Sequence, residues 1–517
     1  MKQRWPPPFL WLLALYPPVA LLAANIQQVD PVQALRATVV CLVAMLLLHL
    51  FIGLVAPAPG AAVLTATVWL IFFTYGHVYT ALQASEIGGT LVGRHRYLIP
   101  VALLVLGGGT LLARRLRRPG GWGTALTLMA ASALLLPALT IARFQTRLLA
   151  RPRPSLPILT QAATSGRRPD VYLILLDGYT RQDVLGQSFG VDNQPFLDQL
   201  RSLGFIVPDC SVSNYSQTEL TLATAFNFAY LEDLPVQLAS EGNDRTSLFF
   251  LIRHSALRQT LEAAGYRTVA FESGYAWSEW QDADIYLRPK LAGLDLTRLF
   301  GRLNAFEALM LETTALPILS DTQVAMLGLT GDLETGPLTV HRERVAHILD
   351  QLPNVPAMSD EPKLVFAHIV APHRPFIFRP EAGSPLLDTY LIPGFEMNAS
   401  PGYIAGYRNQ VMYLNGIVPD ILAHILDESK APPLIYLFGD HGPDDAVGAE
   451  RMAILQALYL PGLTPTDNLA GLTPINAIRL LLDQGLGYAL PPLPNQSYYS
   501  DYDLPYQLSP IEDGCRP

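Results

Sequence analysis

Residues 434–445 read LIYLFGDHGPDD. Five apolar or aromatic residues run into a glycine, and an acid and a histidine, Asp440 and His441, follow side by side. A short, continuous apolar run that ends at a glycine turn is typical of a strand buried on both faces. The stretch therefore predicts a buried strand that presents two titratable side chains at its carboxyl end.

The same pattern recurs earlier in the chain, at 171–180 (VYLILLDGYT), 266–273 (YRTVAFES) and 363–373 (KLVFAHIVAPH). Patterns typical of helices lie between these runs, at 193–205 and 406–426. Strands that alternate with helices predict an α/β domain. We therefore expect a mostly parallel sheet flanked by helices.

Titratable side chains stand at or just after the ends of three predicted strands. They are Asp177, His368, His373, Asp440 and His441. Polar sites of parallel α/β sheets form outside the carboxyl ends of the strands, so we expect these side chains on one rim. A single aspartate there is more often a helix cap, and a single histidine is more often packed, but three coinciding segments favour a shared site. Carboxylates with imidazole suit a divalent metal such as Zn²⁺ or Mn²⁺.

The segment 209–227 (DCSVSNYSQTELTLATAFN) is rich in hydroxyl groups and continues into a helix-like run. A serine or threonine at a helix N-terminus lies where free N–H groups and the helix dipole favour an anion. Coordination to a metal would lower the pKa of such a hydroxyl and make it a nucleophile. The alternative, which the residues leave open, is an ordinary N-capping hydroxyl.

The first 150 residues differ in composition from the rest. Half of the whole chain is hydrophobic and only 15% is charged, and residues 1–150 carry 11 Lys or Arg but only two acids, Asp30 and Glu86. The remainder carries 24 basic and 42 acidic residues. This front part contains five apolar runs near membrane-spanning length, at 7–25, 33–56, 61–84, 97–113 and 122–142.

We therefore predict a transmembrane domain of about five helices at 1–145, an interfacial linker at 146–168 and a catalytic domain at 169–517. Lys2, Arg4 and the cluster RRLRR favour a cytoplasmic N-terminus under the positive-inside rule. Arginines of the linker count against this orientation. We keep it, which makes the protein a multi-pass cell-membrane protein with an extracytoplasmic catalytic domain.

The chain has three cysteines, Cys41, Cys210 and Cys515. Cys41 lies in the second apolar run, where packing is the simplest interpretation. Cys210 and Cys515 suit a disulfide in an oxidising compartment, but their spacing alone does not decide whether they pair.

The order LLDGY, the hydroxyl-rich segment, HIVAPHRPF and then GDHGP resembles the alkaline-phosphatase/sulfatase superfamily. With the membrane region in front, the chain is most similar to membrane-anchored phosphoethanolamine transferases and lipoteichoic acid synthases, over most of residues 169–465. The resemblance implies an α/β sheet and a metal bound by two carboxylates, a histidine and the nucleophile. It also implies a phospho-threonine intermediate.

The resemblance assigns roles to individual residues of this chain. It implies metal ligands at Asp177, Asp440 and His441, with Thr218 as both the nucleophile and the fourth ligand. Ser216 is the alternative nucleophile. His368 and His373 would face the phosphate and the leaving group, and His373 is preferred because it follows a proline in the loop.

The chain departs from these relatives at several positions. Asp177 stands where the transferases have glutamate, and no histidine follows His441, so Arg451 is a candidate for the missing positive charge, with a surface salt bridge as the alternative. The multiple disulfides of phosphoethanolamine transferases are absent. Cys210 is followed by SVSN rather than by the sulfatase signature, which argues against a formylglycine nucleophile and sulfate ester hydrolysis.

The function predicted from the sequence is a membrane-anchored, metal-dependent phosphotransferase. It would move a phospholipid-derived phosphoryl head group to a cell-envelope glycan or lipid. One alternative is a hydrolase of the same fold that uses water as acceptor, either a phosphodiesterase or phosphatase or a sulfuric ester hydrolase. Another is an inactive membrane scaffold. The acidic charge of the second half argues against a nucleic-acid partner.

Overall fold

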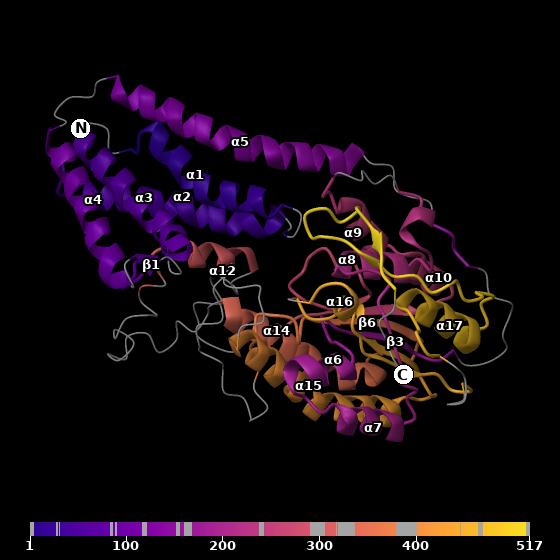
Figure 1. Ribbon diagram of the computed structural model, residues 1–517. Helices are drawn as coiled ribbons and strands as arrows, with labels where there is room; N and C mark the ends of the chain where they lie inside the picture. Colours follow the sequence, from indigo (N-terminus) through magenta and orange to yellow (C-terminus); the bar gives the residue numbers. More distant parts are fainter. Residues whose placement is uncertain are drawn as a thin grey trace. The chain divides into compact units, whose positions relative to one another are not determined.

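The computed structural model divides the chain into two compact units, drawn in Figure 1 and described separately below. One unit contains residues 1–151 and 291–340, and the other contains residues 152–290 and 341–517. The residues that the structure describes are 5–26, 29, 31–82, 86–87, 90–115, 121–150, 156–159, 168–236, 242–289, 305–316, 318, 337–378, 401–444, 446–463 and 469–512.

All five predicted apolar runs form helices. They are α1 (Pro8–Ala24), α2 (Ala34–Ile52), α3 (Ala58–Leu82), α4 (His95–Arg115) and α5 (Trp122–Ala150). The short strands β1 (Glu86–Ile87) and β2 (Thr90–Leu91) pair between α3 and α4. In the described part of the chain, four helices are long and apolar enough to cross a membrane, at 31–52, 59–82, 95–115 and 122–147, and α1 with its 17 residues is shorter.

Large apolar side chains remain exposed on these helices, including Leu104 of α4 and Leu136 of α5. In water such a surface would be a binding or aggregation site, whereas in a bilayer it is the surface that faces lipid. The chain is therefore a membrane protein.

A segment of the predicted catalytic domain groups with this membrane unit. Its helix α12 (Ala305–Glu312) buries Phe306 and Met310 in the same apolar cluster as side chains of α1 and α2. Glu307 of α12 forms an ion pair with Arg36 of α2. The membrane unit is thus built from two separate stretches of sequence, whereas the predicted domain at 169–517 treats this segment as catalytic.

The second unit contains a six-stranded sheet with the order β5-β4-β6-β3-β7-β8. Its strands are β3 (Val171–Leu176), β4 (Arg267–Phe271), β5 (Ile285–Leu287), β6 (Lys363–Ile369), β7 (Leu434–Phe438) and β8 (Gln456–Tyr459). Five strands are parallel, and β8 pairs antiparallel with β7 at one edge. The predicted mostly parallel sheet is confirmed.

The central strand β3 lies between β6 and β7, and every residue of these three strands is buried. Leu175 of β3 is in register with His368 of β6 and Phe438 of β7. Because the strands are parallel and in register, their carboxyl ends open at the same edge. The residues that follow β3, β6 and β7 therefore emerge side by side.

Helices cover both faces of the sheet, as expected for continuous apolar strands. Val171, Leu173 and Leu175 of β3 belong to an apolar cluster formed with one set of helices, and the alternate residues of the strand face the opposite side. The helices in that cluster are α8 (Thr218–Ala225), α9 (Thr246–Arg253), α10 (Ala256–Ala263) and α17 (Pro474–Leu486). The remaining described helices of four residues or more are α6 (Gln182–Phe189), α7 (Gln194–Ser202), α14 (Pro337–Gln351), α15 (Pro401–Glu428) and α16 (Ala449–Met452).

Shorter elements complete the unit. They are the 3₁₀ segments η2 (Leu231–Asp233) and η4 (Leu352–Met358) and the paired strands β9 (Tyr498–Tyr499) and β10 (Ser509–Pro510). The helix-like patterns at 193–205 and 406–426 correspond to α7 and α15, and both predictions are confirmed.

Candidate active site

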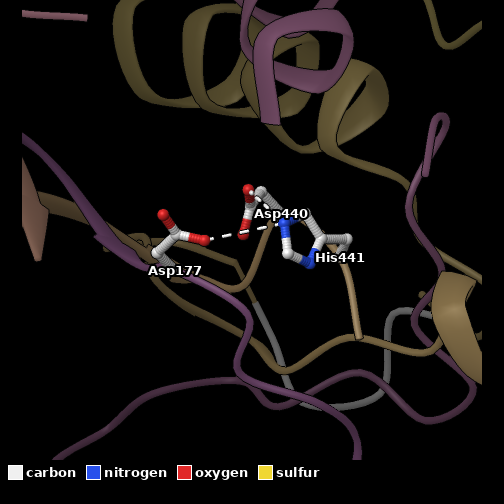
Figure 2. Close-up of side chains that lie close together, drawn as sticks. All are labelled: Asp177, Asp440 and His441. Carbon is white, nitrogen blue, oxygen red and sulfur yellow. Dashed lines mark ion pairs between the residues drawn. The ribbon is translucent and has the colours of Figure 1, made fainter. Parts of the chain in front are cut away.

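Three predicted ligands meet at the carboxyl edge of the sheet. Asp177 follows β3, and Asp440 and His441 follow β7. One potential ligand atom from each lies within 4.8 Å of the others. Figure 2 shows the Asp177 carboxylate facing the Asp440 carboxylate and the His441 ring. Nε2 of His441 lies 3.6 Å from Asp177 and 3.4 Å from Asp440, and these contacts are ion pairs only when the ring is protonated.

One oxygen of each aspartate has no hydrogen-bond partner, and Nε2 of His441 is free to accept a proton or a metal, with the Thr218 hydroxyl 3.2 Å away. Nδ1 of His441 donates to the carbonyl of Gly442 at 2.7 Å, so Nε2 carries the lone pair in the neutral ring. Oδ1 of Asp177 and Oδ2 of Asp440 are buried and have no hydrogen-bond partner. Unsatisfied buried oxygens are costly, and a divalent cation bound by both oxygens, with Nε2 of His441 as a third ligand, would satisfy them. The residues therefore fit a divalent metal.

Two glycines shape the turns that carry these ligands. Gly178 has a φ of +74° and donates its N–H to Oδ1 of Asp440 at 3.0 Å, which links the ends of β3 and β7. Gly442 does not have a positive φ. The reason for glycine there is close approach: a Cβ atom would collide with the backbone carbonyl of Glu450.

The predicted nucleophile lies beside this cluster. Thr218 is the first residue of α8, and its hydroxyl Oγ1 lies 3.2 Å from Nε2 of His441. At this position the hydroxyl is next to the free N–H groups of the first helical turn. Ser216, the alternative nucleophile, is engaged elsewhere, because its hydroxyl donates to the carbonyl of Ser500 and accepts from the Ser500 N–H, both at 3.0 Å.

His368 contacts the Asp177 carboxylate and Ser278, so neither of its ring nitrogens is left to face a substrate. Its Nε2 donates to Oδ2 of Asp177 at 3.1 Å, and its Nδ1 lies 2.9 Å from the hydroxyl of Ser278. The ring is buried and both nitrogens are engaged. This arrangement suits a residue that orients the Asp177 carboxylate, as the outer hydrogen-bond partners of metal ligands commonly do.

His373 lies on the loop after β6, with its ring centre 6.2 Å from that of His441. Its Nδ1 donates to the carbonyl of Arg374 at 2.5 Å, and its Nε2 lies 3.3 Å from Oδ2 of Asp444. Burial lowers the pKa of His373, but the charges of Asp444 and Asp177 outweigh it and raise the pKa to about 10. A raised pKa keeps His373 protonated at neutral pH, with its Nε2 in an ion pair with Asp444.

The imidazolium in turn affects the acids. Burial raises the pKa of Asp177, but the charges of His373 and His368 and the hydrogen bond from His368 lower it to about 2. The pKa of Asp444 lies well below its usual range, because His373 and Arg451 outweigh the effect of burial. Both carboxylates are ionised at neutral pH.

Asp444 and Arg451 are site residues whose roles the sequence did not settle. Nη1 of Arg451 bonds to Asp444 at 3.1 Å and to the carbonyl of Gly442 at 2.9 Å, and its Nε bonds to the carbonyl of Ser216 at 3.0 Å. Arg451 thus links the loop after β7, which carries Asp440 and His441, to the segment that precedes Thr218. Asp444 lies three residues after His441 in residues 434–445. A further acid so close to the predicted ligands was the sequence feature that could have identified it as a site residue.

Cys210 is disulfide-bonded and Cys41 is free, whereas Cys515 lies outside the described residues. A disulfide-bonded Cys210 is not available for conversion to formylglycine. This agrees with the absence of the sulfatase signature in the sequence.

Comparison with protein families gives one match. The family model described as Sulfatase matches residues 169–464, which is more than half of the chain. No curated protein matches the sequence significantly.

Several solved structures are similar to the chain at low identity. The lipooligosaccharide phosphoethanolamine transferase A (EptA) from Neisseria meningitidis is 12% identical, covers 97% of this chain and 98% of its own, and has a TM-score of 0.45. The C-terminal periplasmic domain of EcEptC from Escherichia coli, in complex with Zn, is 14% identical, covers 67% of this chain and 94% of its own, and has a TM-score of 0.41. The lipoteichoic acid synthase LtaP from Listeria monocytogenes is 14% identical, covers 64% of this chain and 76% of its own, and has a TM-score of 0.34.

Proposed function

The chain belongs to the sulfatase family of enzymes, and from this premise we propose that it is a membrane-anchored, metal-dependent phosphotransferase. Thr218 takes a phosphoryl-linked head group from a phospholipid and passes it to a glycan or lipid of the cell envelope. The observation that supports this proposal most is the position of the Thr218 hydroxyl, 3.2 Å from Nε2 of His441 and beside two carboxylates with unpaired oxygens.

Asp177, Asp440, His441 and the oxygen of Thr218 would hold the metal, Zn²⁺ or Mn²⁺. When bound, the metal supplies positive charge that lowers the pKa of the hydroxyl and neutralises phosphoryl oxygens. The chain prepares these ligands in advance. The low pKa of Asp177 keeps it ionised, and the bond from Nδ1 of His441 to a backbone carbonyl orients the ring so that Nε2 faces the two carboxylates.

Thr218 would enter and leave the reaction as an alkoxide, its proton having passed to solvent beforehand. In the first transfer, a bond forms between Oγ1 of Thr218 and the phosphorus atom, and the bond from phosphorus to the diacylglycerol oxygen breaks. We assign to His373 the proton that this leaving oxygen takes up, because His373 is protonated and its ring lies 6.2 Å from that of the metal-ligand candidate His441. In the second transfer an acceptor hydroxyl attacks the phosphorus, Thr218 leaves, and the proton of the acceptor returns to His373. His368, which shared this predicted role, is assigned to the orientation of Asp177.

We place the catalytic unit outside the cytoplasm, tethered by a multi-pass membrane domain. The basic cluster at 114–118 and the basic N-terminus support this orientation. A catalytic unit joined to membrane helices meets head groups at high effective concentration. A phospholipid donor and an envelope acceptor are therefore the proposed substrates.

The test is the intact mass of the purified full chain in nanodiscs of phosphatidylethanolamine and phosphatidylglycerol, with Mn²⁺ or Zn²⁺. The full chain is needed because residues 291–340 group with the membrane unit. We expect a head-group-sized phosphoryl adduct that maps to Thr218. It should be absent in Thr218→Ala and present in the control Ser216→Ala.

The other outcomes separate the alternatives. An adduct that forms and then decays in water without any modified acceptor would identify a hydrolase. An adduct that maps to Ser216 would refute the assignment of the nucleophile. The absence of both adduct and bound metal would refute an enzymatic role and favour a membrane scaffold.

A further inference from the structure

The residues on both sides of Thr218 are held by one buried guanidinium group. Gln217 precedes the nucleophile and Glu219 follows it, and both side chains are buried. Nη2 of Arg245 donates to Oε1 of Gln217 at 2.8 Å, and Nε of Arg245 lies 3.6 Å from Oε1 of Glu219. Arg245 is only 5% exposed, so these interactions form away from bulk water.

A carboxylate directly after the nucleophile is a problem for phosphate chemistry. Burial raises the pKa of Glu219, and the charge of Arg245 opposes this shift. The incoming phosphoryl group is anionic, and negative charge on Glu219 beside Thr218 would repel it through an environment that screens charge poorly. Leaving a buried carboxylate unpaired is also costly for the fold. The positive charge of Arg245 offsets both effects.

The C-terminal segment holds Gln217 and Arg245 from the opposite side. Nε2 of Gln217 donates to the hydroxyl of Ser500 at 2.9 Å and to the carbonyl of Asp501 at 3.0 Å. Arg245 donates to the carbonyl of Tyr502, and its guanidinium carbon lies 4.3 Å from the centre of the Tyr502 ring. Because both ends of the Gln217 amide are engaged, the side chain has a single favoured orientation.

These contacts act on the first turn of α8. Gln217 is the N-cap residue of that helix, and its carbonyl accepts the N–H of Thr221 at 3.0 Å. Holding the N-cap fixes the direction in which the first helical residue presents its side chain. That residue is Thr218.

We propose that Arg245, held by residues 500–502, is a positioning residue for the nucleophile. It bonds to Gln217, contacts Glu219 and so holds the Thr218 hydroxyl toward the phosphorus atom. This inference rests on the proposed function. It assigns the C-terminal segment, more than 280 residues away in sequence, to the support of the active site.

The test uses the full chain in the same nanodiscs and compares Arg245→Met with wild type. Three quantities are measured: the single-turnover rate of adduct formation at saturating phosphatidylethanolamine, the donor concentration for half-maximal rate, and the affinity for Mn²⁺. We expect the rate to fall about 100-fold, the effect of misplacing a reacting group by about 1 Å. The half-maximal concentration should stay close to wild type. The Mn²⁺ affinity should fall far less than the rate, because Asp177, Asp440 and His441 are unchanged and only the fourth ligand, Thr218, is displaced.

Arg258→Met is the matched control. Arg258 is also buried, pairs with Glu262 and Asp282, and has its guanidinium over the Trp280 ring at 5.1 Å. It should lower thermal stability as Arg245→Met does, without the loss of rate. A second comparison adds Glu219→Gln to Arg245→Met, which should recover about tenfold of the rate by removing the unpaired charge.

Amide hydrogen exchange of residues 216–222 tests positioning without reference to activity. Exchange should be faster in Arg245→Met than in Arg258→Met. Unchanged exchange, or a rate loss equal in the two variants, would overturn the inference. If wild type forms no adduct, the proposed function fails, and the exchange comparison still decides whether Arg245 orders the first turn of α8.

Discussion

Asp440 is the position where one substitution should separate metal binding from folding. Its carboxylate is fully buried, Oδ1 accepts the Gly178 N–H at 3.0 Å, and Oδ2 has no hydrogen-bond partner and lies 3.4 Å from Nε2 of His441. Asp440→Asn keeps a carbonyl oxygen for Gly178. It also places an amide NH₂ beside the lone pair of His441, where a hydrogen bond can form.

Without metal, the substitution should stabilise the protein. It removes an unsatisfied buried oxygen, whose cost is about 1–3 kcal/mol, and adds a hydrogen bond worth about 1 kcal/mol. We expect the melting temperature of the metal-free variant to exceed that of metal-free wild type by about 2–5 °C.

With metal, the order should reverse. A metal at about 1,000 times its Kd stabilises wild type by about 4 kcal/mol. A neutral amide in place of the charged ligand should lower the affinity by about 100-fold or more, since losing only an outer partner costs 10–100-fold. At the same metal concentration the variant would then gain about 1.4 kcal/mol or less.

The assay is thermal unfolding of the full chain in detergent, once with chelator and once with saturating Mn²⁺ or Zn²⁺. Asp170→Asn is the control, because Asp170 precedes β3 at the opposite edge of the sheet and pairs with Lys363 at 3.0 Å. It should lower the melting temperature equally in both conditions. The reasoning is refuted if metal-free Asp440→Asn melts at or below metal-free wild type, or if metal raises the melting temperature of both by the same amount.

His368→Gln should lower metal affinity in calorimetric titration by about 10–100-fold, because His368 orients Asp177, and an unchanged affinity would contradict that role. Asp444→Asn should move the alkaline limb of the activity profile down by about 1–3 pH units, because Asp444 helps to raise the pKa of His373 to about 10. The direction follows from the raised pKa of His373: its proton, and the stability that this proton contributes, are present at neutral pH and are lost as the pH rises through about 10. If the alkaline limb of the activity profile does not move in Asp444→Asn, His373 is not the acid. Gly442→Ala should cost about 1–3 kcal/mol in a denaturant titration, because the added methyl group meets a backbone carbonyl, and a neutral effect would show that the loop can shift.

The local patterns of the sequence determined the elements and the chemical character of the site. Continuous apolar runs predicted β3, β6 and β7, because a strand buried on both faces has no polar side. The long apolar runs of the first 150 residues predicted membrane helices, because length and hydropathy suffice for that inference. The aspartate and histidine after β7 indicated a metal site, because carboxylate and imidazole groups are metal ligands in any fold.

Contacts between distant segments were decided only by the tertiary structure. The sequence could not show that His368 bonds to Asp177 while His373 pairs with Asp444. His368 lies near the end of β6 and His373 on the loop after it, and only packing sets the directions of their side chains. Nor could it show that Ser500 holds Gln217. Such contacts form when the summed burial of many residues outweighs the entropy of closing long loops, and no local stretch encodes that balance.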